Sequence, residues 1–187
     1  ILRRVLEDIA TARDHGENWP RVAVNLASAQ LGDPDFPEQV RTLLERCGVP
    51  GDHLCMEVVE DQLKSESAGL MDTLNRLHGL GIQLAIDDFG TGYSSLARLK
   101  RFPFQQLKID RSFIRGLPHD TNDHAIVLSI IGLASGLGLE VVAEGVESVA
   151  QRDWLCDHGC TLLQGYLLAR PQPLNDVQRL LEAHHSG

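Results

Sequence analysis

The sequence lacks an excess of positive charge. Its 17 Lys and Arg residues are outnumbered by 26 Asp and Glu residues, which gives a formal net charge of −9 at pH 7. Proteins that bind nucleic-acid polymers or membrane surfaces electrostatically carry a basic patch. The charge balance therefore argues against a DNA or RNA partner and against membrane contact by this domain. An anionic ligand would have to be held by recruited cations.

Other features are also missing. No apolar run approaches the ~18 residues of a membrane span, and the N-terminus has no signal-peptide pattern. Cys156 and Cys160 lack the Cys-x-x-Cys spacing of a zinc cluster, so we predict reduced thiols and a cytoplasmic location. There is no initiator Met, and Ile1 opens in the middle of a helical pattern. We therefore expect a fragment of a longer protein.

Short apolar runs alternate with amphipathic helical patterns along the 187 residues, a length sufficient for one domain with a substantial core. This alternation predicts a parallel sheet covered by helices. No Gly-x-Gly-x-x-Gly follows the first run, which argues against a dinucleotide-binding fold. The predicted strands are residues 22–26, 54–60, 83–87, 106–110, 140–144 and 162–166.

Every predicted strand holds a polar residue within it or at its C-terminal end. Active sites of (β/α)8 barrels are assembled from such strand ends. One buried polar residue is often satisfied by hydrogen bonds alone, but a charged residue on strand after strand requires ion pairs or bound metal. An eight-stranded barrel typically needs about 250 residues. We therefore predict an α/β fold, a (β/α)8 TIM-type barrel incomplete at its N-terminus. The polar residues are Asn25, Glu57, Asp87 with Asp88, Lys108, Glu144 and Gln164.

Asp87 and Asp88 follow an apolar run directly, and a loop containing Gly90 and Gly92 comes next. Two adjacent carboxylates repel each other unless positive charge lies between or beside them. The pattern therefore predicts a divalent-metal site below a mobile loop. The alternative is a strand that ends in an ordinary polar turn, because Asp and Gly are common turn residues.

Six short motifs occur together in one order along the chain. They are residues 24–26 (VNL), 57–60 (EVVE), 87–96 (DDFGTGYSSL), 107–113 (LKIDRSF), 142–147 (VAEGVE) and 164–166 (QGY). In this set and order the chain resembles the EAL domain, the bacterial cyclic-di-GMP phosphodiesterase. The resemblance implies a single domain over residues 1–187. It also implies a TIM-type barrel that hydrolyses one phosphodiester of cyclic-di-GMP to linear pGpG.

The resemblance also implies a role for each matching residue. Asn25, Glu57, Asp87 and Glu144 would bind divalent metal, and Asp88 would reach a second ion. Lys108 and Asp110 would position and activate the attacking water. Glu60 would anchor the loop from Phe89 to Ser95, Gln164 would contact water or ligand, and Glu147 would support the site. Such oxygen ligands, without His or Cys, suit two Mg²⁺ or Mn²⁺ ions.

Two of these assignments have simpler alternatives. Lys108 could be a solvated lysine, although it lies between Leu107 and Ile109 in an apolar run. Asp110 could be an ordinary partner of Arg111.

One family motif is missing, the Glu-Ala-Leu segment that would lie upstream of the first helix. Without its Glu and the neighbouring Arg, we expect this fragment alone to be a poor catalyst. The alternatives are a catalytically silent cyclic-di-GMP receptor and a protein-docking module, and both should have lost metal ligands that are kept here. The resemblance is compatible with an upstream sensory or cyclase domain. It is also compatible with a homodimer formed through the loop after Asp88 and the helix beyond Asp110.

Overall fold

The computed structural model describes residues 1–14, 19–64, 68–91 and 99–185. Six strands form one sheet in the order β1-β2-β3-β4-β5-β6, and each strand is parallel to its neighbour. All six predicted strands are present in these positions. They are β1 Val22–Asn25, β2 Leu54–Val59, β3 Gln83–Phe89, β4 Gln106–Ile109, β5 Glu140–Glu144 and β6 Leu162–Gln164.

Helices lie between most successive strands of the described chain, and α7 begins and ends at recognisable capping residues. Asp120 accepts hydrogen bonds from the backbone N–H groups of Asn122 and Asp123 at the start of α7, and Gly138 ends that helix in the left-handed conformation. The helices are α1 Leu2–Asp14, α2 Ser28–Leu31, α3 Phe36–Cys47, α4 Ala68–Gly79, α6 Arg111–Ile114, α7 Thr121–Leu137, α8 Val149–Asp157 and α9 Leu174–His185, with 3₁₀ turns η1 Gly51–His53 and η2 Glu60–Lys64.

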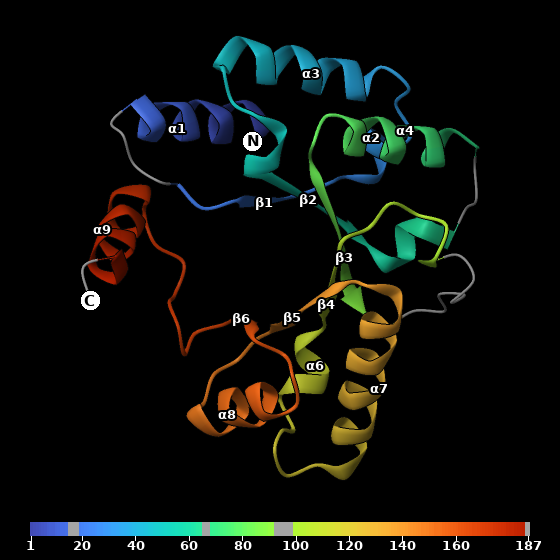
Figure 1. Cartoon of the computed structure of the whole chain (residues 1–187), viewed down its shortest axis with the longest axis vertical. Helices are drawn as coiled ribbons and strands as arrows, with labels where there is room; N and C mark the ends of the chain where they lie inside the picture. The colour runs from blue at the N-terminus through green and yellow to red at the C-terminus, as the bar shows by residue number, and fades with distance from the viewer. Residues whose placement is uncertain (15–18, 65–67, 92–98, 186–187) are drawn as a thin grey trace.

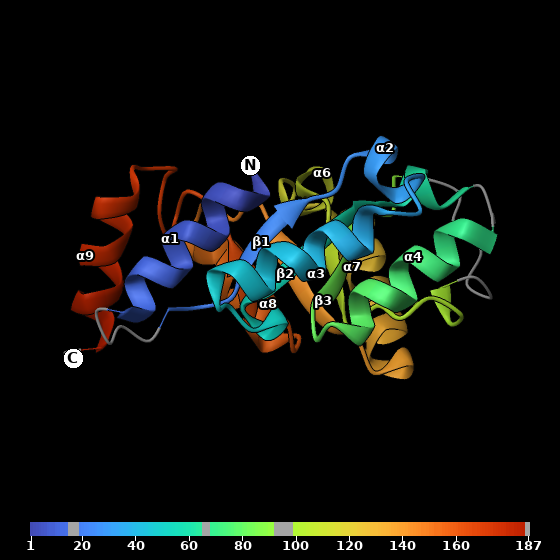
Figure 2. The same cartoon turned by 90° about the horizontal axis from the view of Figure 1, so that it is seen from above.

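The sheet curls, and helices pack around its outer side (Figure 1). Helices α1, α3 and α4 lie beside the half that contains β1 and β2, whereas α7 and α8 lie beside the half that contains β4 to β6 (Figures 1 and 2). Sequential parallel strands with helical crossovers, curled in this way, define part of a TIM-type barrel. The predicted fold class is thus confirmed.

Burial divides the sheet into a centre and two edges. Met56, Ile86 and Leu107 on the central strands are fully buried, while β1 and β6 have alternating half-buried and exposed residues. At the second edge, Leu162 is 42% exposed. Within the described ranges, no helix has the length and apolar character needed to cross a membrane.

Candidate metal centre at the strand ends

Two adjacent aspartates reach the same cluster because β3 is irregular at its end. Successive side chains of a regular strand point to opposite faces. The register between β3 and β4 shifts between Ile86 and Phe89, and Asp88 has a φ of 54°. A left-handed conformation is unfavourable for a non-glycine residue and persists where surrounding structure enforces it. The distortion turns the carboxylates of Asp87 and Asp88 toward a common point.

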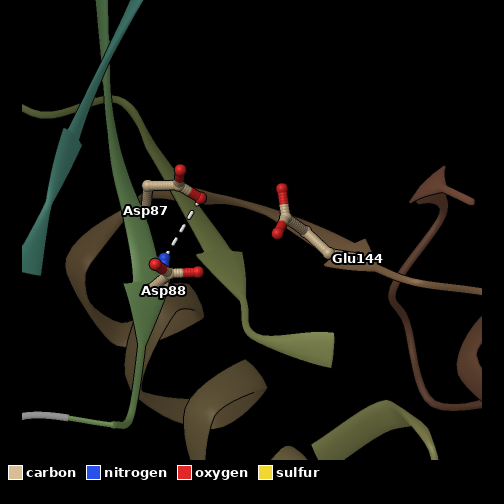
Figure 3. A group of neighbouring side chains, drawn as sticks. All are labelled: Asp87, Asp88 and Glu144. Atoms are coloured by element: carbon tan, nitrogen blue, oxygen red, sulfur yellow. Dashed lines mark hydrogen bonds between the residues drawn. The ribbon is translucent and has the colours of Figure 1, made fainter. Parts of the chain in front are cut away.

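Glu144 at the end of β5 completes an acidic group with this pair. Asp87, Asp88 and Glu144 each offer a carboxylate oxygen, and these oxygens all lie within 4.8 Å of one another. Figure 3 shows the Glu144 carboxylate pointing toward the two aspartates across the end of the sheet. The backbone N–H of Asp88 donates a hydrogen bond of 3.1 Å to Oδ1 of Asp87, which fixes the orientation of that carboxylate.

Lys108 on β4 lies among these carboxylates. Its Nζ is 2.7 Å from Oε1 of Glu57 and 3.4 Å from Oδ1 of Asp87, and it also forms an ion pair with Glu144. Lys108 is only 4% exposed, so the solvated-lysine interpretation is wrong. Buried charges must be paired. The structure therefore brings together five of the predicted residues: Glu57, Asp87, Asp88, Lys108 and Glu144.

The environment changes the proton affinity of these groups. Burial alone would lower the pKa of Lys108, but hydrogen bonds to Glu144 and Glu57 and their negative charges raise it above its ordinary value. Burial raises the pKa of Glu144, and Lys108 opposes that rise. Burial and the nearby charges of Asp87 and Asp110 raise the pKa of Asp88. The cluster holds more negative charge than one ammonium group can balance.

Asp110 has a local structural role as well as a place beside the cluster. Its carboxylate accepts a hydrogen bond of 2.9 Å from the backbone N–H of Ser112 and so caps α6. Burial would raise the pKa of Asp110, but hydrogen bonds from Ser112, a hydrogen bond with Asp88 and the charge of Arg111 lower it. Asp110 therefore contacts the cluster through Asp88, and Arg111 is a secondary electrostatic partner.

Glu60 lies where it can hold the start of the loop that follows Asp88. It is 3% exposed, and its Oε2 accepts a hydrogen bond of 2.9 Å from the backbone N–H of Gly90. Gly90 has a φ of 100°, and a Cβ atom there would lie 2.8 Å from Cε2 of Phe113. Glycine is needed here for both backbone angle and space. The remainder of the predicted loop, residues 92–95, lies outside the described residues, so its anchoring stays a prediction.

The remaining predicted residues lie toward the edges. Asn25 on β1 is exposed and lies opposite Glu57 in the sheet register, while Gln164 on β6 is exposed and lies opposite Glu144. Glu147 is exposed, and its backbone N–H donates to Oε1 of Gln151, 2.8 Å away. The structure thus places Asn25 and Gln164 next to cluster residues in the register, whereas Glu147 lines a separate cavity.

Sequence reasoning missed the cavity beside Glu147. It has a volume of about 410 Å³ and is lined by Arg111, Ser112, Arg115, Gly145, Glu147 and Gln151. Arg111 and Arg115 are four residues apart and therefore lie on one face of α6 and its extension. This Arg-x-x-x-Arg spacing directly after the Lys108–Asp110 motif was the signal that could have revealed it.

The cluster fits a hard divalent cation. The converging donors of Asp87, Asp88 and Glu144 are carboxylate oxygens, the ligands preferred by Mg²⁺ and Mn²⁺, and they come from the ends of β3 and β5. Carboxylates that face one another at a sheet end, with one buried ammonium group among them, form a site with residual negative charge. The fold and the site together define a TIM-type barrel protein with an acidic cluster at its strand ends that suits a divalent cation.

Comparison with known proteins identifies the family. The family model described as the EAL domain matches residues 1–171, so the chain belongs to the EAL domain family. It is 44% identical over 184 residues to the cyclic di-GMP phosphodiesterase NbdA of Pseudomonas aeruginosa, a match that covers 98% of this chain and 24% of NbdA. The chain thus spans about a quarter of the length of this curated relative.

Solved structures show the same fold. A structure of the PaMucR phosphodiesterase in complex with c-di-GMP superposes with a TM-score of 0.88 at 41% identity, covering 94% of this chain and 71% of that one. Klebsiella pneumoniae BlrP1, in a manganese and cyclic-di-GMP complex at pH 9.0, superposes with a TM-score of 0.80 at 33% identity, covering 91% of this chain and 44% of that one.

Proposed function

We propose that this chain is the phosphodiesterase part of a longer protein and that it hydrolyses one phosphodiester bond of cyclic-di-GMP to linear pGpG. The observation that carries the proposal is the convergence of the Asp87, Asp88 and Glu144 oxygens around a buried lysine in an EAL domain. The names of NbdA and PaMucR support the reaction and the ligand.

The carboxylates would hold two divalent ions, Mg²⁺ or Mn²⁺. Asn25, Glu57, Asp87 and Glu144 would bind metal, and Asp88 would contribute to the second ion. Such ions supply charge stabilisation for phosphoryl oxygens and activate water for attack. The manganese complex of BlrP1 supports this choice of metal. The ions would also reverse the local charge that otherwise repels a phosphodiester.

The chain's own residues would perform the remaining tasks. Lys108 would offset charge on the phosphate oxygens, since its ammonium group lies among the ligands. Asp110, whose carboxylate lies near that of Asp88, would orient the attacking water. Glu60 would hold the loop after Asp88, Gln164 would contact water or ligand at the rim, and Glu147 would support the cavity beside the site.

Residues 1–187 would form one domain that is completed by an upstream segment carrying the Glu-Ala-Leu motif and the two remaining strands. The exposed strands β1 and β6 support this, because exposed sheet edges are unfavourable unless covered. The longer protein would carry a sensory or cyclase domain, as the bifunctional cyclase and phosphodiesterase MucR does by name. On its own the 187-residue chain would be a poor catalyst.

The test is hydrolysis of cyclic-di-GMP with Mn²⁺ by this chain and by a form extended upstream by about 60 residues, the shortfall from a typical barrel. The expected result is pGpG formation by the extended form only, and its loss on addition of EDTA. Cyclic-di-GMP binding without cleavage by both forms would contradict the enzyme and indicate a receptor.

A further inference from the structure

The ammonium group of Lys108 is already engaged by the carboxylates of the cluster. An ammonium group has three donors and no acceptor. Here it contacts three carboxylates, those of Glu57, Asp87 and Glu144, while its side chain is 5% exposed. In this arrangement the ammonium group is directed at carboxylates, with Glu57 and Glu144 at hydrogen-bond distance and Asp87 at 3.4 Å, and not at a water or a phosphate oxygen. Lys108 can act on a substrate only after it has released at least one of these carboxylates.

The carboxylates that Lys108 contacts overlap with those that converge for a metal. Asp87 and Glu144 belong both to the acidic group and to the ion pairs of Lys108. A divalent ion at these oxygens and an ammonium group at contact distance would repel each other strongly, because neither is screened by bulk water. The two cations therefore compete for the same pair of carboxylates.

We propose that Lys108 is a resident counter-cation and that metal binding is an exchange in which the incoming divalent ion displaces the ammonium group from Glu144 and Asp87. The exchange gives Lys108 two successive roles. Before metal binds, it neutralises carboxylates that would otherwise be buried as like charges, which lets the sheet end form. After metal binds, its released donors become available to the substrate, so catalytic readiness depends on metal loading.

This inference rests on the proposed metal site, but not on the identity of the substrate. The exchange and a purely supporting role of Lys108 predict opposite changes in metal affinity when Lys108 is removed. A lysine that only positioned the carboxylates would, on removal, leave a disordered and weaker metal site. A lysine that competes with the metal would leave a stronger one.

The test is calorimetric titration of the upstream-extended form with Mn²⁺ alone, comparing the parent protein with Lys108→Met. Loss of a competing unit charge at contact distance should tighten Mn²⁺ binding about tenfold or more. Lys100→Met is the charge-matched control, since Lys100 is exposed and lies outside the cluster, and its affinity should match that of the parent. Equal or weaker Mn²⁺ binding by folded Lys108→Met would overturn the proposal.

A second measurement covers the case in which Lys108→Met does not fold. The ammonium signal of Lys108, followed by NMR in the unsubstituted extended form during titration with Mg²⁺, should move in step with metal occupancy, whereas those of Lys64 and Lys100 should not. An unchanged Lys108 signal at saturation would overturn the exchange. If the parent protein binds neither Mn²⁺ nor Mg²⁺, both the proposed metal site and the proposed exchange are wrong. Failure of hydrolysis alone, with exchange observed, would overturn only the proposed reaction.

Discussion

Polar residues at the ends of the central strands are buried, whereas those at the ends of the edge strands of the same sheet are exposed. Glu57 on β2 and Lys108 on β4 are at most 5% exposed and paired with each other. Asn25 on β1 and Gln164 on β6 occupy neighbouring register positions but are exposed. A strand with neighbours on both sides gains a dry environment in which charges interact strongly, whereas a strand at an edge does not.

This difference in burial indicates which part of the site can form from this chain alone. The centre holds its charges by mutual pairing within β2 to β5. The edge residues have neighbours on one side only and would gain their partners from the strands that complete the barrel. We therefore expect substitutions at the centre to have larger effects than substitutions at the edges.

The largest effect should follow from Glu144→Gln, which removes the charge of a proposed metal ligand and keeps the shape of the side chain. In the upstream-extended form we expect the hydrolysis rate with Mn²⁺ to fall by about 10³-fold, which corresponds to about 4 kcal/mol of transition-state stabilisation. The measurement is the initial rate of pGpG formation, with circular dichroism to establish that the fold is retained. A decrease in rate of less than tenfold would show that Glu144 is not part of the catalytic site.

The next effect concerns stability without metal. Lys108→Met should lower the free energy of unfolding by about 3 kcal/mol, because removal of one partner of a buried ion pair leaves uncompensated charge. The edge counterpart Asn25→Ala should change it by less than about 0.5 kcal/mol, as exposed substitutions usually do. Urea denaturation in EDTA measures both. Equal losses for the two variants would contradict the distinction between centre and edge.

A smaller effect is expected at the start of the loop. Gly90→Ala should destabilise the protein by about 1–2 kcal/mol, because alanine is strained at a φ of 100° and its Cβ would approach Phe113. Gly132→Ala is the matched control, since Gly132 lies within α7 with no atom within 4 Å of a built Cβ. Alanine at this helical position should stabilise by about 0.5–1 kcal/mol. Thermal unfolding of both variants measures these changes in stability. A change of the same sign in the two variants would contradict the prediction.

The smallest effect should come from the rim. Gln164→Ala in the extended form is expected to reduce the hydrolysis rate by about three- to tenfold, because a neutral contact at an exposed site contributes about 1 kcal/mol. Comparison of kcat and KM with those of the parent protein measures it. A loss as large as that of Glu144→Gln would show that the edge is as important as the centre.

Much of this arrangement could be predicted from the sequence, because local patterns determine it. The six strands were recognisable as short apolar runs, and the positions of Glu57 and Glu144 followed from the rule that parallel strands end at one edge. Periodicity is read along the chain without knowledge of distant contacts. The same reasoning predicted a functional site at the C-terminal ends of the strands.

Other features depend on contacts that no local pattern reveals. The bulge that turns Asp87 and Asp88 to one side requires a positive φ at Asp88, which the residue type alone does not indicate. The three partners of Lys108 come from β2, β3 and β5, and the separate cavity of Glu147 depends on the position of α6. These are products of tertiary packing, so only the folded chain shows them.

The most direct test of the account is anomalous diffraction at the manganese edge from crystals of the upstream-extended form grown with Mn²⁺ and cyclic-di-GMP, using Glu60→Gln if hydrolysis must be slowed. We predict two anomalous peaks about 3.5–4 Å apart, the spacing of two-metal phosphoryl-transfer sites, beside Asp87, Asp88 and Glu144. We also predict that Lys108 has left Glu144. A cyclic-di-GMP complex with no manganese at these carboxylates would contradict the account.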